Sequence, residues 1–303
     1  MRLPALAIAI ALLAGPALYA GDLNETYEEL QQAVAKKDPA LVKRLVLEIH
    51  PLIKEDLAAP APQGEEEKTT WGSHQDYVKG IAIYADYALY ATALVSPPEV
   101  TADLIATLEQ TSPKSKYLDQ AYGTYMAALT KTGGGAKIPA MAEKALANFP
   151  ENEDLLLVLA DNAVSRRQND RAQSYANRLV AVLGRHPKPE GMAAPDWDRK
   201  RNAALGRGYW ISGIISGEQS QYAAADRNLR AALPLIQGAD AMMGPALFYL
   251  GVANYNIGKM TNNKAKMLEG AKFSDQAAAL AGPLQEQAWR NAALIKKEAA
   301  TMR

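Results

Sequence analysis

The side chains that most often carry catalysis or metal binding are few and scattered in this sequence. The chain has no cysteine and three histidines, His50, His74 and His186. None of the three stands at helical spacing from a second metal-ligating residue in a recognisable pattern, so the spacing assigns them no ligand role. The acidic pair Glu153-Asp154 lies where a helix start attracts carboxylates, and no serine occupies a GxSxG turn. We therefore expect no catalytic residue, no metal and no cofactor.

Two glycine-containing segments have a superficial likeness to phosphate-binding loops. Residues 132–137, TGGGAK, lack the GxxxxGK[ST] spacing and follow a helical pattern, whereas that loop follows a strand. Gly206-Arg207-Gly208 has no preceding strand and lacks the third glycine of a dinucleotide-binding fingerprint. We interpret the first segment as a turn between helices and Gly208 as a point of close helix contact.

Aromatic side chains are the remaining source of binding chemistry. Tyr84, Tyr87 and Tyr90 recur at helical spacing in an alanine-rich stretch. At this spacing they either fill the core or line an aromatic interior that holds a small molecule, and the sequence leaves both alternatives open.

The composition predicts an all-α protein. Hydrophobic residues make up 49% of the chain, many of them alanine, and only 3 are phenylalanine, which suits close packing of helix on helix. The 33 basic and 33 acidic residues balance, so the charge does not favour nucleic acid as a partner.

The N-terminus predicts a secretory signal peptide over residues 1–20. Arg2 precedes an apolar run over 3–13, and a small-residue ending leads to cleavage after Ala20. The run is shorter than the roughly 20 residues of a spanning helix. We expect an exported protein, periplasmic or secreted, with no integral membrane span in the mature chain.

Residues 21–96 are expected to form helical hairpins that precede the main array. Asp38-Pro39 looks like a turn that opens a second helix. The polar, proline-containing and acidic stretch 58–70 is interpreted as an exposed loop. Ser73 and Asp76 resemble a capping box, so a helix is expected to begin at that point.

A repeat is visible in three segments that end alike, at Pro113, Pro150 and Pro187. Each closes an alanine-rich helical pattern about 37 residues after the previous one. Units of this length, built of two helices and a turn, stack on their neighbours to bury their apolar faces.

Within this array the residues resemble the tetratricopeptide repeat family. Ala172 follows Ile138 by 34 residues and Leu179 follows Ala145 by 34, each pair in one slot of the motif. The stretch 209–233 is the best match. In it Gly213 stands at the helix A glycine, Tyr222 opens helix B, and Ala225 and Ala232 fill the small slots.

A further unit over 250–258 places Gly258 at the turn, and Asn263 and Gly270 replace the expected alanines, so its helix B is expected to start near Lys264. The resemblance covers residues 97–303. Its spacing predicts a loop inserted at 184–202, in which Trp197 either packs on the array or contacts a partner. Residues 283–302 are expected to form a capping helix, with Leu284, Ala288, Asn291, Ile295 and Ala299 on one face.

The resemblance implies a right-handed superhelical solenoid of antiparallel helix pairs whose A helices line a concave groove. The family's groove positions correspond here to Asp161, Arg207, Trp210, Ile214, Phe248, Val252, Tyr255 and Asn256. Among them Trp210, Phe248 and Tyr255 are the main candidates, because large aromatic side chains dominate binding energy at interfaces. The same three side chains also suit the seam between repeats.

The function expected from these features is a non-catalytic scaffold or adaptor of the cell envelope, similar to the exported bacterial members of the family. It would bind a partner protein or peptide in the groove. The alternative is a small-molecule carrier that uses the tyrosine-rich interior, and an enzyme is a third hypothesis without a visible site.

Overall fold

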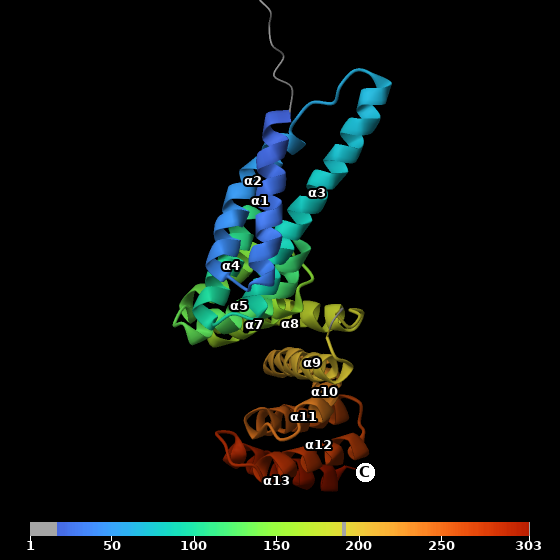
Figure 1. The fold of residues 1–303 in the computed structure, drawn as a ribbon. Helices are drawn as coiled ribbons and strands as arrows, with labels where there is room; N and C mark the ends of the chain where they lie inside the picture. Colours follow the sequence, from blue (N-terminus) through green and yellow to red (C-terminus); the bar gives the residue numbers. More distant parts are fainter. Residues whose placement is uncertain (1–16, 190–191, 303) are drawn as a thin grey trace, which may run out of the picture. The chain divides into compact units, whose positions relative to one another are not determined.

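The protein is helical throughout the part that the computed structural model describes, residues 17–189 and 192–302 (Figure 1). This part contains thirteen α-helices and no strand, which confirms the predicted all-α class. Residues 1–16 of the predicted signal peptide lie outside it, and residues 17–20 belong to the first helix. None of the described helices combines the length and the apolarity that crossing a membrane requires.

The chain divides into two compact units, at Gly135. Consecutive helices pack against each other within each unit. The division lies after residue 97, the expected start of the repeats, so two helices that the sequence assigns to the array belong to the first unit. The helices of the first unit are α1 (Ala17–Ala35), α2 (Pro39–Leu57), α3 (Glu65–Leu94), α4 (Pro98–Thr111) and α5 (Lys116–Lys131).

The first hairpin forms as its sequence predicts. Asp38 caps α2, since its side chain accepts a hydrogen bond of 3.0 Å from the amide of Leu41, and Pro39 occupies the first helical turn. Leu30, Leu45 and Ile49 are fully buried between α1, α2 and α3. The hairpin is therefore held by an apolar seam and one polar cap.

The exposed loop expected at 58–70 ends at Gly64. The prediction is therefore wrong for residues 65–70. Helix α3 begins at Glu65 and continues unbroken through Ser73, where the capping box was expected to start it. Three glutamates in the first turn of α3 interact favourably with the positive end of the helix, which explains why this acidic run is helical. The Ser73 hydroxyl instead donates back to the carbonyl oxygen of Thr69.

The second unit is a succession of helices from residue 136 onward (Figure 1). Pro113, Pro150 and Pro187 each lie in the connection after a helix, namely α4, α6 and α8, which confirms that they close helical segments. The elements of this part are η1 (Gly135–Lys137), α6 (Ile138–Leu146), α7 (Glu153–Ser165), α8 (Asn169–Leu183), α9 (Ala194–Glu218), α10 (Tyr222–Ala232), η2 (Leu233–Leu235), α11 (Asp240–Met260), α12 (Lys264–Ala278) and α13 (Gln285–Thr301).

The positions that the 34-residue spacing relates are buried. Ile138, Ala145, Ala172 and Leu179 all belong to the core, and so do Ala225 and Ala232 of the best-matching unit. Helix α10 begins at Tyr222 and α12 at Lys264, both as predicted. The 34-residue spacing therefore relates residues that are all buried in the core.

Glycines allow α9 to approach α10 closely, and α11 to approach α12. A Cβ atom added at Gly213 of α9 would lie 2.5 Å from Leu229 of α10. Gly258 was expected at a turn, but α11 continues past it to Met260, and a Cβ there would lie 2.5 Å from Met267 of α12. Gly258 is needed for helix contact, and the turn follows it.

Replacing Gly270 with alanine is expected to lower the free energy of unfolding by about 1–3 kcal/mol, because a small-to-large change here overpacks the seam. A Cβ at Gly270 would lie 2.8 Å from both the carbonyl oxygen of Gly251 and the amide nitrogen of Tyr255, and backbone atoms cannot move aside cheaply. Gly244→Ala in α11 is the control, since its Cβ meets no atom within 4 Å. That change should be neutral or stabilise by up to about 1 kcal/mol. Equal effects of the two changes in urea titrations would contradict the close contact.

The inserted loop expected at 184–202 is shorter than predicted. The connection between α8 and α9 covers residues 184–193, of which 190 and 191 are not described, and residues 194–202 form the first turns of α9. Pro195 explains the helix start, because its fixed φ suits the first helical turn. Trp197 is buried against Leu156, Leu179 and Leu183, so of its two expected roles packing is confirmed.

The C-terminal helix α13 covers most of the expected segment 283–302. Ala288, Ile295 and Ala299 are buried on its inner face. Leu284 is half-buried just before the helix, and Asn291 is half-buried on it.

Candidate functional site

Four of the eight predicted groove residues line one cavity of the second unit. Phe248, Val252, Tyr255 and Asn256 project from α11, which packs against α9 on one side and α13 on the other. The cavity has a volume of about 510 Å³. We call it the inter-helix cavity; its lining residues are Gly217, Glu218, Phe248, Tyr249, Val252, Tyr255, Asn256, Gln287, Asn291, Leu294 and Ile295.

The floor of the inter-helix cavity is apolar. Phe248 is only 4% exposed and contacts Tyr249 edge to face, with ring centroids 5.2 Å apart. Ile295 of α13 is buried, whereas Leu294 beside it is 48% exposed. Leu294 therefore offers a ligand more apolar surface than Phe248 does, although Phe248 was the residue predicted to bind.

One wall depends on a glycine at the end of α9. A Cβ at Gly217 would lie 2.6 Å from Cδ1 of Tyr249, so only glycine leaves room for this ring. Burial raises the pKa of Tyr249, and the neighbouring Glu218 carboxylate raises it further. Tyr249 thus remains a neutral hydrogen-bond donor at physiological pH.

Tyr255, another lining residue, contacts a compensated pair of charges that lies outside the lining. The Tyr255 hydroxyl donates to Glu298 Oε2 at 2.7 Å and accepts from Lys259 Nζ at 3.0 Å. Lys259 and Glu298 also form an ion pair of 3.2 Å. Hydrogen bonds from Tyr255 and Lys259 lower the pKa of Glu298, so the carboxylate stays charged and paired.

Three amide side chains add hydrogen-bonding capacity to the cavity. Asn256 donates through Nδ2 to the carbonyl oxygen of Val252 at 2.8 Å, which leaves its oxygen free to accept. The side chains of Gln287 and Asn291 of α13 form no hydrogen bond with another described residue. Amides both donate and accept, so this set can pair with the peptide groups of an extended ligand.

The other predicted groove residues lie outside the inter-helix cavity and tie helices together. Arg207 donates to Asp161 Oδ1 at 2.7 Å, and its guanidinium lies 4.8 Å from the ring centroid of Trp210. Trp210 in turn donates through Nε1 to the carbonyl oxygen of Met242 at 2.8 Å. Ile214 packs against the core of α10 and α11. These contacts hold α7, α9 and the start of α11 in register.

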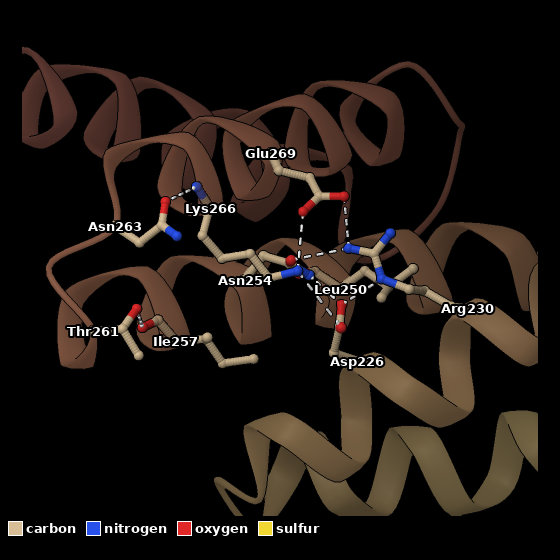
Figure 2. A network of polar contacts seen from close by, with 9 residues as sticks. All are labelled: Asp226, Arg230, Leu250, Asn254, Ile257, Thr261, Asn263, Lys266 and Glu269. Carbon is tan, nitrogen blue, oxygen red and sulfur yellow. Dashed lines mark hydrogen bonds and ion pairs between the residues drawn. The ribbon is translucent and has the colours of Figure 1, made fainter.

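A polar network of side chains from α10, α11 and α12 fixes α11 against its two neighbours (Figure 2). Asn254 is fully buried; its Nδ2 donates to Asp226 Oδ1 at 2.6 Å, and its Oδ1 accepts from Arg230 at 3.0 Å. Arg230 also donates to Asp226 at 2.8 Å and to Glu269 at 2.7 Å. Burial acts to raise the pKa of Glu269, but hydrogen bonds from Arg230 and Lys266 outweigh it and lower that pKa. Because Asn254 directly precedes Tyr255 and Asn256, the network positions the cavity residues.

Replacing Asn254 with alanine is expected to lower the free energy of unfolding by about 2–3 kcal/mol, because two charged partners each lose a partly buried hydrogen bond. The matched control is Asn256→Ala in the same helix. Asn256 is half-buried and bonds only within its own helix, so its loss should cost less than about 1 kcal/mol. Urea titrations of both variants provide the measurement. A smaller loss for Asn254→Ala than for Asn256→Ala would contradict the role assigned to the network.

The tyrosines of α3 form a row at the surface of the first unit, in place of the enclosed aromatic interior that a carrier was expected to use. Tyr84 lies edge-on to Tyr27 of α1 at 5.3 Å, and Tyr87 and Tyr90 each lie 5.6 Å from Tyr117 of α5. Tyr87 is 42% exposed. Burial raises the pKa of Tyr84 and of Tyr90, so these phenols are neutral.

Two of the three histidines, His74 and His186, lie close to carboxylates. His74 Nε2 lies 2.8 Å from Asp56 Oδ1, and His186 lies 3.5 Å from Glu153. Within residues 17–189 and 192–302, no cluster of three or more histidine and acidic side chains could hold a metal ion.

Sequence reasoning missed Glu218, Tyr249 and Leu294. The cavity needs α13 beside α11, whereas the sequence treats residues 283–302 only as a cap. One signal was available: Gly217 directly precedes Glu218 within a helix, and a helical glycine often marks the close approach of another element.

No protein-family model matches this chain, and no curated protein matches its sequence.

Proposed function

We propose that the protein is a non-catalytic scaffold that binds a segment of a partner protein in the inter-helix cavity. The observation that carries this proposal is the composition of the cavity, in which three helices contribute an apolar floor, three amides and one carboxylate. Amides that can pair with peptide groups beside an apolar contact surface suit an extended peptide.

The proposal includes the architecture and location expected from the sequence. The second unit is a tetratricopeptide-like array, a right-handed superhelical solenoid of antiparallel pairs with α9, α11 and α13 on its concave side. Buried positions at 34-residue spacing and the packing of α11 against both α9 and α13 support it. The apolar N-terminal sequence supports export to the periplasm or beyond the cell.

The experiment compares two exposed leucines of the second unit. Leu294 lines the inter-helix cavity and is 48% exposed, and Leu268 of α12 lies outside that lining and is 46% exposed. The protein and its Leu294→Arg and Leu268→Arg variants are used to capture partners from an envelope extract of the source cells, with mass spectrometry as the readout. We expect the Leu294→Arg variant to lose a specific protein that the other two retain. Retention of every captured protein by Leu294→Arg would reject this site.

A small-molecule carrier is the second candidate, supported by the tyrosine row of the first unit. Phenol rings offer flat apolar faces, and their hydroxyls add hydrogen bonds at little cost in side-chain entropy. Native mass spectrometry of the purified protein tests this function. A bound ligand that disappears in Tyr87→Ala would favour it, and a ligand-free protein would count against it.

A further inference from the structure

We propose that the inter-helix cavity recognises a lysine or arginine side chain of the partner segment, and that this side chain binds at the Glu218 carboxylate, beside the ring of Tyr249. This inference rests on the proposed function and adds the chemical class of the partner: an extended segment in which a basic residue neighbours an apolar one.

Among the described residues, the Glu218 carboxylate of the cavity lining forms no ion pair. Its neighbours in the described residues are neutral: Asn169 Nδ2 donates to it at 3.1 Å, and the phenol of Tyr249 lies close enough for the Glu218 carboxylate to raise its pKa. By contrast, the charge of Glu298, which bonds to the lining residue Tyr255, is balanced by Lys259 at 3.2 Å. A cationic group of the ligand would therefore meet its complement at Glu218.

The position of Glu218 in α9 supports a role in binding. Glu218 is the last residue of the helix, where the exposed carbonyl groups already create negative potential. An acidic residue there weakens the helix, so helix stability does not account for it. For a bound cation the helix end and the carboxylate act together.

Aromatic and amide groups complete the recognition. The ring of Tyr249 lies beside Gly217 at the same end of the cavity, and a guanidinium or ammonium group gains a cation–π contact from such a ring. Val252 and Leu294 supply apolar surface for the neighbouring side chain. Asn256 and Asn291 line the same cavity and can pair with the peptide groups that join the basic and the apolar residue of the ligand.

The extent of the cavity favours a peptide segment over a free small cation. It is lined by residues of α9, α11 and α13, and packed helices lie about 8–10 Å apart. The lining therefore covers about two helix spacings, which corresponds to five or six residues of extended chain. A single ammonium ion or amine would leave most of this surface uncovered.

The test uses the full chain and a displayed library of random octapeptides, from which binders are selected and resynthesised. We expect the binders to contain a lysine or arginine. Exchanging this residue for norleucine should weaken binding at least about tenfold, as should Glu218→Gln, because a charge-assisted hydrogen bond is lost. Glu286→Gln is the control. Glu286 is exposed, pairs with Arg290 and lies outside the cavity lining, so binding should not change.

A charge exchange gives a second readout. Glu218→Lys should abolish binding of the basic peptide and restore binding of a peptide that carries glutamate at the same position. If peptides bind in a Leu294-dependent way but show no basic preference and no loss in Glu218→Gln, the inference is overturned and the proposed function stands. If no peptide binds in a way that Leu294→Arg removes, both are rejected.

Discussion

Replacing Phe248 with alanine is expected to lower the free energy of unfolding by about 3–5 kcal/mol, the range for truncating a buried aromatic side chain. Phe248 is 4% exposed and packs with Leu247, Ala277 and Ala288, so its loss leaves a void between α11, α12 and α13. The measurement is a urea titration followed by circular dichroism. Amide hydrogen exchange should show faster opening in these three helices.

The control is Leu294→Ala in the same cavity. Leu294 is largely exposed, so this change should alter the stability by less than about 1 kcal/mol. A cost below about 1 kcal/mol for Phe248→Ala as well would show that the ring is not held in the core. If Phe248→Ala unfolds the second unit, it cannot be used to locate the binding site, because an unfolded variant loses its partner whichever residues bind it.

Replacing Trp197 with alanine is expected to cost a similar 3–5 kcal/mol. Trp197 lies at the start of α9 and fills the space between Leu156 of α7 and Leu179 and Leu183 of α8. Its removal should therefore open a cavity that joins three helices. Urea titration provides the free energy, and hydrogen exchange should show that α7, α8 and α9 become less protected together.

Trp289→Ala is the matched control for this second prediction. Trp289 is 66% exposed on α13, so the same substitution should change the stability by about 0.5 kcal/mol or less. Should the two tryptophan variants prove equally stable, Trp197 would belong to an exposed loop, as the sequence allowed, and the start of α9 would need revision.

The helical core could be predicted from the sequence because repeated small residues leave few ways to pack. Ala172 and Leu179 of α8 are buried, as are Ile138 and Ala145 of α6, 34 residues earlier in each case. Gly213 was assigned to a helix, and the structure places it where the side chain of Leu229 approaches. In each case a local pattern coincides with a tertiary contact.

The helix starts could not be predicted as well. Residues 65–70 and 194–202 contain several charged or proline residues, which are also typical of loops, yet both segments are helical. At a helix start acidic residues and proline are favourable, so the same composition serves two structures. For residues 194–202, only the packing of Trp197 distinguishes a helix from a loop, and packing cannot be read from a single sequence.

The candidate site was predicted in part. The resemblance placed Phe248, Val252, Tyr255 and Asn256 on one surface, and these residues do line one cavity. The same reasoning grouped Asp161 and Trp210 with them, although these two side chains bond to neighbouring helices. A motif assigns helix faces, but the side chains that complete a cavity come from whichever helix packs next to it.

Site-specific photo-crosslinking tests the central claim, partner binding in the inter-helix cavity, most directly. A photoreactive phenylalanine analogue replaces Leu294 in one variant and Leu268 in another, and both are irradiated in the source cells. The account predicts a specific crosslinked protein from position 294 only, joined through a segment that contains a lysine or arginine. Crosslinks of equal yield from both positions, or from position 268 alone, would contradict it.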